Sequence, residues 1–481
     1  MSAIDSLEPQ AIWSHFSKIL SIPRPSGYEG RIADHLVEFA RQNGLSCTKD
    51  AVNNVIIESP ATKGRENTPS VILQAHIDMV PVAAAGVTHD FKNDPIDAYV
   101  EDGWVRAHGT TLGADDGLGV ATILAILEDK NLSHGPLRAI FTVEEETTMK
   151  GAGSLDKKYL DADYLINLDS EDNGKLFVSC AGSAEVTINF SFERVLADGC
   201  DALSLRLSDL SGGHSGSDIN KGHANAISVM AAILNEISDE CDFFIQDING
   251  GQVRNSIPSE TVCTVCCPKD ETGRFTEAFK KSFEKYRNVY KATDPNMKLE
   301  IVSASCAQAL SYADSLSLIE LIRALPLGPS RMFDIDPSIV ETSCNLGTIR
   351  SFDGKIVLGL MPRSLKEDNL DDIIDRINAT AYLLDNTETE IDSRHFCWES
   401  PDKNSLIDAM QQSYKKVTGS KFQITAIHAG LECAAFSKMN PKLQLVSVGS
   451  TIINPHSPKE RAEILGAGQI FETVKNTIEN I

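Results

Sequence analysis

The sequence lacks an excess of basic residues. Its 481 residues include 44 Lys and Arg but 68 Asp and Glu, which gives a formal net charge of −24. Such an acidic chain repels phosphate groups and anionic lipid, and no local basic patch offsets this charge. We therefore expect neither nucleic acid nor a membrane surface as a partner, and the acidity fits a soluble protein.

Long hydrophobic runs are also missing. No apolar stretch approaches the ~20 residues that are needed to cross a bilayer. The first residues, MSAIDSLEPQAIWSHFSKIL, contain acidic groups and lack the basic start and short apolar run of a secretory signal. We therefore expect a cytoplasmic protein.

The cysteines do not form a disulfide framework. There are 11, an odd number, and only Cys263, Cys266 and Cys267 lie close together in the chain. A Cys-x-x-Cys pair could be half a zinc site or a redox pair, but no second pair or nearby histidine completes it. Small buried thiols in a strand, reduced as in the cytoplasm, are the favoured interpretation.

What the sequence does contain is the composition of a globular protein, with 42% hydrophobic and 23% charged residues. At roughly 150 residues per domain, the length predicts two or three domains. In the amino-terminal part, short apolar runs alternate with helical patterns, which is typical of an α/β domain with a mostly parallel sheet. The expected strands are 54–58, 71–75, 138–143 and 164–168, and the expected helices are 12–20, 32–43 and 117–129.

The pattern changes after Gly182 and returns from Asn404. Between these points, alternating runs and separate helices indicate an α+β domain. The expected strands there include 185–190, 202–207, 252–257 and 261–266, and the expected helices include 225–236 and 275–290. After Asn404 we expect a helix over 406–417, a strand over 443–448 and a last helix from Ile464. The simplest organisation is one discontinuous α/β domain, residues 1–182 and 397–481, interrupted by an inserted domain, residues 183–396.

Potential metal ligands follow four of the expected strands. These strands lead into His76 and Asp78, into Glu144–Glu146, into Asp169, and towards His456. A fifth candidate, Asp115, lies in the loop GTTLGADDG before the helix 117–129. Because ligands bind beyond the carboxyl ends of parallel strands, we expect these side chains to lie close together.

Each of these residues has a structural alternative when it stands alone. Asp115 could cap a helix, Glu144–Glu146 could be solvated charges, and Asp169 or His456 could be turn residues. Clustered carboxylates, however, repel one another unless a positive charge lies among them. Zn²⁺ accepts imidazole and carboxylate together, whereas a Mg²⁺ or Ca²⁺ site is expected to be all oxygen. A pair of zinc ions therefore fits this set, and it would activate water for hydrolysis.

Eight strings spread along nearly the whole chain resemble those of the aminoacyl-histidine dipeptidases. They are QAHIDMVP, GTTLGADDG, Glu145-Glu146, NLDSE, GGHSG, RNSIP, HAGLEC and PHSP. The resemblance places the chain in a broader family of carnosinases, aminoacylases and carboxypeptidases. It implies a di-zinc exopeptidase-type α/β catalytic domain, whose mostly parallel sheet is flanked by helices, and an inserted α+β lid domain that also serves dimerisation.

The same resemblance implies the roles of the metal-site residues. The five zinc ligands would be His76, Asp115, Glu146, Asp169 and His456. Asp115 would bridge the two metals, Asp78 would orient the imidazole of His76, and Glu145 would be the general base. It also implies two Zn²⁺ per chain, with Co²⁺ or Mn²⁺ as possible substitutes, and a cis peptide bond after Asp115.

For the substrate, the resemblance implies contacts from both domains. His214 would contact the scissile carbonyl or its oxyanion, and Asn255 and Arg363 would hold the terminal carboxylate. His428 and Glu432 would line the pocket, where Glu432 would suit a free α-amino group.

The expected activity is zinc-dependent hydrolysis of dipeptides, preferentially Xaa-His and carnosine-like substrates, by a homodimer. The alternatives are a related amidohydrolase, such as an aminoacylase or a carboxypeptidase, and a catalytically inactive binding or scaffold protein on the same fold. The complete ligand set, together with Glu145 and Asp78, counts against the inactive alternative.

Overall fold

The computed structural model describes residues 3–401 and 403–481. The chain forms two compact units, which we call the first and the second unit. The first unit comprises Met1–Ser179, Trp398–Ala426 and Leu431–Ile481, and the second comprises Cys180–Cys397 and Ile427–Gly430. The boundaries 1–182, 183–396 and 397–481 remain a prediction for where independently folding domains begin and end.

The first unit contains a mixed nine-stranded sheet in the order β1-β2-β6-β3-β7-β24-β8-β22, with β23 paired to β8. Its strands are β1 (Ser46–Lys49), β2 (Val55–Ser59), β3 (Val71–His76), β6 (Leu137–Thr142), β7 (Tyr164–Asn167), β8 (Lys175–Cys180), β22 (Trp398–Glu399), β23 (Gln423–Ile427) and β24 (Gln444–Ser447). The four central strands β6, β3, β7 and β24 are parallel, while β1, β2 and β8 pair antiparallel with their neighbours. A small sheet holds β4 (Ala98–Glu101), β5 (Trp104–Ala107), β25 (Ile452–Ile453) and β26 (Arg461–Glu463). The mostly parallel α/β sheet predicted from the sequence is confirmed in this central part.

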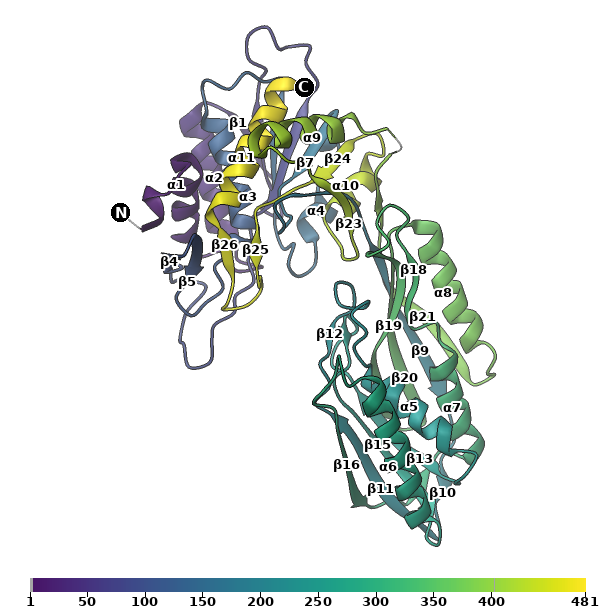
Figure 1. Cartoon of the computed structure of the whole chain (residues 1–481). Coiled ribbons are helices and arrows are strands. Elements are labelled where there is room, and N and C mark those ends of the chain that lie inside the picture. The colour runs from purple at the N-terminus through teal and green to yellow at the C-terminus, as the bar shows by residue number, and fades with distance from the viewer. Residues whose placement is uncertain (1–2, 402) are drawn as a thin grey trace. The chain divides into compact units, whose positions relative to one another are not determined.

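Helices pack around this sheet, some directly on its strands and some on other helices. They are α1 (Gln10–Leu20), α2 (Gly30–Asn43), α3 (Ala114–Glu128), α4 (Lys150–Ser154), α9 (Ser405–Thr418), α10 (Cys433–Met439) and α11 (Ile464–Asn480), with 3₁₀ turns at Ala3–Ser6 and Lys157–Leu160. Helix α3 is buried along nearly its whole length between β3 and α1, and α9 lies against α11 (Figure 1). The apolar pattern of α3, without a polar face, is therefore that of a core helix.

The second unit is built on an antiparallel nine-stranded sheet in the order β16-β11-β15-β13-β19-β20-β9-β21, with β18 paired to β19. Its strands are β9 (Gly182–Ser191), β11 (Cys200–Ser208), β13 (Phe244–Gly250), β15 (Thr261–Pro268), β16 (Lys298–Ala304), β18 (Gly328–Met332), β19 (Val340–Phe352), β20 (Lys355–Ser364) and β21 (Thr387–His395). Two short pairs are β10 (Val195–Leu196) with β17 (Gln308–Ala309), and β12 (Gly213–His214) with β14 (Ser256–Ile257). Helices α5 (Ala226–Ile237), α6 (Thr272–Val289), α7 (Tyr312–Ala324) and α8 (Glu367–Ala381) pack in the order α6, α5, α7, α8 along the sheet (Figure 1).

Two expectations about the second unit are wrong. The strand expected over 252–257 is mostly a turn, because the chain leaves β13 at Gly250 and pairs again only at Ser256–Ile257. The cysteines of β15 are buried as expected, but they are not all free thiols, since Cys266 forms a disulfide with Cys306. In the part of the chain that the structure describes, no helix is long and apolar enough to cross a membrane.

We expect Phe16→Ala to lower the free energy of unfolding of the first unit by about 3–5 kcal/mol. Phe16 is fully buried, and its ring meets that of Trp13 edge-on at 5.9 Å. Urea unfolding followed by tryptophan fluorescence isolates this unit, because all three tryptophans, Trp13, Trp104 and Trp398, belong to it. The control Leu465→Ala, at a side chain that is 66% exposed, should change stability by less than about 0.5 kcal/mol. Equal effects of the two substitutions would contradict this packing.

Candidate metal centre

The proposed metal ligands of the first unit converge on Asp115. One carboxylate oxygen of Asp115 lies 3.0 Å from Nε2 of His76, and the other lies 3.0 Å from Nε2 of His456. His76 also lies 3.3 Å from Asp169, and His456 lies 3.0 Å from Glu146. The structure therefore brings all five proposed ligands together in two groups that share Asp115.

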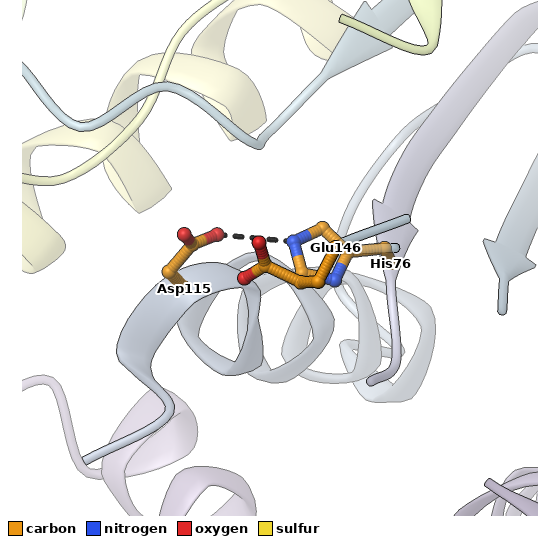
Figure 2. Close-up of side chains that lie close together, drawn as sticks. All are labelled: His76, Asp115 and Glu146. Carbon is orange, nitrogen blue, oxygen red and sulfur yellow. Dashed lines mark hydrogen bonds and ion pairs between the residues drawn. The ribbon is translucent and has the colours of Figure 1, made fainter. Parts of the chain in front are cut away.

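Three of these residues could hold one metal ion. His76, Asp115 and Glu146 each offer a ligand atom, and these atoms all lie within 4.8 Å of one another. Figure 2 shows the three side chains turned toward a common point from β3, from the start of α3 and from the loop after β6. One imidazole with two carboxylates is a donor set that Zn²⁺ accepts.

Asp78 holds His76 from behind. Its carboxylate lies 3.2 Å from Nδ1 of His76, and it accepts hydrogen bonds from the backbone N–H groups of Glu145 and Glu146 at 3.1 and 3.3 Å. The hydroxyl of Ser26 donates to it at 2.8 Å. A carboxylate on Nδ1 favours the tautomer that leaves Nε2 available to a metal, and the orienting role of Asp78 stays a prediction.

The site carries more negative charge than its imidazoles neutralise. Burial raises the pKa of Asp169, and burial together with the charge of Asp169 raises the pKa of Glu145. Hydrogen bonds to Asp115 and Glu146 raise the pKa of His456 to about 11. Burial opposes ionisation of Asp115, but its hydrogen bonds with the two histidines keep its pKa low. A bound cation would relieve the same repulsion.

Asp115 is not the cap of α3. The backbone of Asp115 and Asp116 is not yet helical, and the Asp116 carboxylate accepts the N–H of Gly119 at 3.0 Å, as a side-chain cap does. The Asp115–Asp116 peptide bond is cis, as the resemblance implied. The cap interpretation of Asp115 is therefore wrong, and its carboxylate is available to the centre.

A row of buried polar side chains crosses the sheet beneath the centre. Ser447 donates to Asn167, Asn167 donates to Gln74, and Gln74 donates to Glu432, at 2.5, 2.6 and 2.7 Å. Thr142 also donates to Glu432, at 2.6 Å. All five side chains are fully buried. Sequence reasoning did not single out the first three or Thr142, although a polar residue inside an apolar strand such as VILQAH is a signal for them.

Glu432 is therefore buried within this row of polar side chains and is not exposed on a pocket wall. Its Oε2 is held by Gln74 and Thr142, while its Oε1 has no hydrogen-bond partner among the described residues. Burial raises its pKa to about 7, against the opposing effect of the hydrogen bond from Thr142. The expected contact of Glu432 with a substrate amine stays a prediction.

The second unit brings together three of the residues predicted to bind substrate, namely Arg363, His428 and His214. Arg363, on β20, is 6% exposed, and burial lowers its pKa to about 10. His428 lies 2.7 Å from the Ser343 hydroxyl, and burial, followed by the charges of Arg363 and His214, lowers its pKa to about 3. The polar partners of Arg363 are Ser215 at 3.3 Å and the Met361 sulfur at 3.3 Å, and no carboxylate forms an ion pair with it among the described residues.

His214 and Asn255 are joined through the backbone. Nδ1 of His214 accepts the N–H groups of Gly216 and Ser217, both at 3.2 Å, which leaves the proton of the neutral ring on Nε2. The carbonyl of Asn255 accepts the N–H of Ser215 at 2.9 Å, while the residue itself is exposed. The geometry thus orients the His214 ring, while the Asn255 side chain forms no hydrogen bond with the residues that the structure describes.

The sequence pattern of peptidase family M20/M25/M40 matches residues 72–480. The chain belongs to this family. The resemblance stated from the motifs is thereby confirmed, and with it membership in a family of metallopeptidases.

Two full-length relatives are similar to this M20 chain. The cytosol non-specific dipeptidase of Escherichia coli strain K12 is 36% identical over 484 residues, which cover 100% of this chain and 99% of that protein. The crystal structure of aminoacylhistidine dipeptidase from Vibrio alginolyticus, 35% identical, matches with a TM-score of 0.88 over 100% of this chain and 98% of that chain. The aminopeptidase PepT of Bacillus cereus, 16% identical with a TM-score of 0.58 over 98% of both chains, shares the fold alone.

Glu432 should make the first unit less stable as the pH rises. Its pKa is about 7 in the folded chain, against 4.5 for an ordinary glutamate, so the folded state keeps a proton that the unfolded chain releases. Its contribution is fully present below pH 4.5 and is lost as the pH rises through 7. Glu432→Gln cannot ionise, and its stability relative to the native chain should therefore grow by at most about 3 kcal/mol over this window, at about 1.36 kcal/mol per pKa unit.

Urea unfolding of the metal-free native and Glu432→Gln chains across this pH window, followed by tryptophan fluorescence, measures the difference. A difference that stays constant with pH would contradict the raised pKa of this carboxyl.

Proposed function

We propose that this M20 chain is a zinc-dependent dipeptidase that prefers Xaa-His and carnosine-like substrates. The observation that carries the proposal is the position of the Asp115 carboxylate, 3.0 Å from each of two histidines that belong to separate groups of ligands. Full-length similarity to two proteins named as dipeptidases supports the reaction class. An acylase or an inactive scaffold has no comparable support.

The ligands would be shared between two zinc ions. His76 and Asp169 would hold one ion, His456 and Glu146 the other, and Asp115 both. The compact group of His76, Asp115 and Glu146 would then span the two ions instead of holding a single one. When bound, the ions would supply Lewis acidity toward the peptide carbonyl and the attacking water. Two divalent charges would balance Asp115, Glu146, Asp169 and one hydroxide, which leaves Glu145 free to accept and return a proton.

Glu145 would be the general base. Burial and the charge of Asp169 raise its pKa, which makes it a better proton acceptor than an exposed glutamate. Its backbone is anchored on Asp78, so the same aspartate fixes both the base and the histidine ligand. Glu145 would take a proton from water and deliver it to the departing amine.

In the second unit, Arg363 would pair with the terminal carboxylate of the dipeptide. A buried guanidinium without a carboxylate partner costs free energy that an anionic ligand can offset. The planar guanidinium suits bidentate recognition, and Asn255 and neutral His428 would add hydrogen bonds. His214, with its proton on Nε2, would donate to the scissile carbonyl or its oxyanion.

The breadth of substrates, the cellular location and the oligomeric state belong to the same proposal. The Vibrio relative is named for aminoacylhistidine substrates, while the E. coli relative is named as non-specific and cytosolic. We place this chain in the cytoplasm, as a homodimer, with Xaa-His preferred over other dipeptides.

Metal removal should abolish hydrolysis. We expect about two zinc ions per chain by elemental analysis, and cleavage of glycyl-histidine and carnosine that stops after chelation and returns with Zn²⁺, Co²⁺ or Mn²⁺.

Glu145→Gln should keep its metal while kcat falls by roughly 10²–10⁴-fold, the range for loss of a general base. Asp97→Asn, at an exposed carboxylate outside the proposed ligand set, serves as the matched control. Cleavage of an N-acetylated amino acid alone would move the chain to the acylase alternative.

Glu432→Gln tests recognition of the substrate amine. If Glu432 receives the free α-amino group, this variant should lose far more activity on dipeptides than on N-acylated analogues, measured as kcat/KM on matched pairs. An equal loss on both would rule out that contact and leave Glu432 as part of the buried polar row.

A further inference from the structure

Glu460 is a buried carboxylate that meets the backbone on both sides of Gly113. It is 3% exposed. Its Oε2 accepts the N–H groups of Leu112 and Gly113 at 2.7 and 3.0 Å, and its Oε1 accepts those of Ala114 and Asp115 at 2.8 and 3.5 Å. The N–H groups at a helix start have no partner within the helix. A side chain some 345 residues away in the chain therefore pairs with the N–H groups of the segment that leads into α3, ahead of the local cap that Asp116 provides to Gly119.

Arg24 holds the same peptide from its carbonyl side. Its guanidinium is 1% exposed and donates to the carbonyl of Gly113. It also donates to the carbonyls of Ile77 and Asp78, at 3.0 and 2.6 Å. Arg24 thus ties the segment before Asp115 to the segment after His76.

The glycines of the GADDG loop fit this arrangement. A Cβ at Gly113 would lie 2.8 Å from the Arg24 guanidinium, and a Cβ at Gly117 would lie 2.6 Å from it. Because these approaches are too close for any side chain, the two glycines leave room for Arg24. The glycines of this motif therefore make room for the Arg24 side chain, while the motif also positions Asp115.

The segment that carries Glu460 also carries His456. The N–H of Glu460 donates to the Ser457 carbonyl at 3.0 Å, and His456 lies 3.0 Å from the Asp115 carboxylate. One short segment therefore contacts both the backbone and the side chain of Asp115. A shift of the Glu460 carboxylate would move the peptide of Asp115 relative to both histidines.

We propose that Glu460 and Arg24 form a clamp on residues 112–115 that sets the position of Asp115 and thereby the affinity of the centre for metal. The inference rests on the proposed function, in which Asp115 binds both zinc ions. Neither residue is a ligand or touches substrate in this scheme, so both are positioning residues. Replacing a side chain that positions a metal ligand commonly changes the affinity for the metal by about 10–100-fold.

The test measures zinc affinity directly, by competition with a chromophoric chelator. Glu460→Gln replaces one of the two accepting oxygens by an NH₂ group, which cannot accept a hydrogen bond from the backbone N–H groups. Glu460→Asp keeps the charge but shortens the side chain by one methylene. We expect both to weaken zinc binding by about 10–100-fold, and to alter the visible spectrum of the Co²⁺ form, which reports ligand geometry. Excess zinc should restore part of the hydrolysis.

The matched control is Asp294→Asn in the second unit. Asp294 is 1% exposed and accepts the backbone N–H groups of Ser211 and Ala224 at 2.7 and 2.9 Å. Loss of a buried backbone acceptor there should lower thermal stability and leave zinc affinity unchanged. A merely structural role of Glu460 would give the same result.

Combining Arg24→Lys with Glu460→Asp measures whether the two residues act together on zinc affinity. Since both residues hold the Gly113 peptide, the combined effect of Arg24→Lys and Glu460→Asp on zinc affinity should be smaller than the product of the single effects. A folded Glu460→Asp chain with native zinc affinity, or independent effects of the two changes, would overturn the clamp. A native chain that binds no zinc would instead contradict the proposed function.

Discussion

Asp115 is 8% exposed, and its carboxylate lies within 3.0 Å of two imidazoles and in the field of Glu146 and Asp169. Anionic groups at this density are stable only beside positive charge. Protons on the histidines can supply that charge, which is why the pKa of His456 rises to about 11. Divalent ions can supply it too, and metal binding must then release protons, so metal affinity and pH are linked at this site.

The need to gather several anionic side chains around one point explains why the centre lies at the edge of a parallel sheet. Parallel strands deliver their carboxyl ends to one edge, and β3, β6 and β7 each lead into a proposed ligand there. Successive side chains of a strand alternate between faces, so residues two apart share one. Gln74 and Asn167 precede His76 and Asp169 by two residues, and their hydrogen bonds link neighbouring strands on the face that the ligands use. The buried polar row thus fixes the register of the strand ends as well as filling the core.

The sequence predicts the ligands better than their supports. His76, Glu146 and Asp169 are proposed because they follow apolar strands, and Asp115 because of the GTTLGADDG loop, and both signals are local in the chain. Arg24 and Glu460 are charged residues far from Asp115 in the chain, and only the fold reveals that both are buried against its backbone. The same holds for the disulfide, since Cys266 and Cys306 are 40 residues apart.

The wrong strand has a physical reason of its own. Residues 252–257 alternate in polarity, as a strand would, but Gly251 just before them has φ of 67° and a Cβ there would lie 1.9 Å from the Gly347 carbonyl. The chain turns where a glycine lets two backbones approach, and periodicity alone does not detect such a contact.

The loop HAGLEC links two halves of the proposed recognition by covalent geometry. His428 belongs to the second unit and Glu432 to the first, although they are four residues apart. Four residues span at most about 14 Å when fully extended. The two side chains are therefore tied by the chain itself, through a loop that passes from one unit to the other between Gly430 and Leu431.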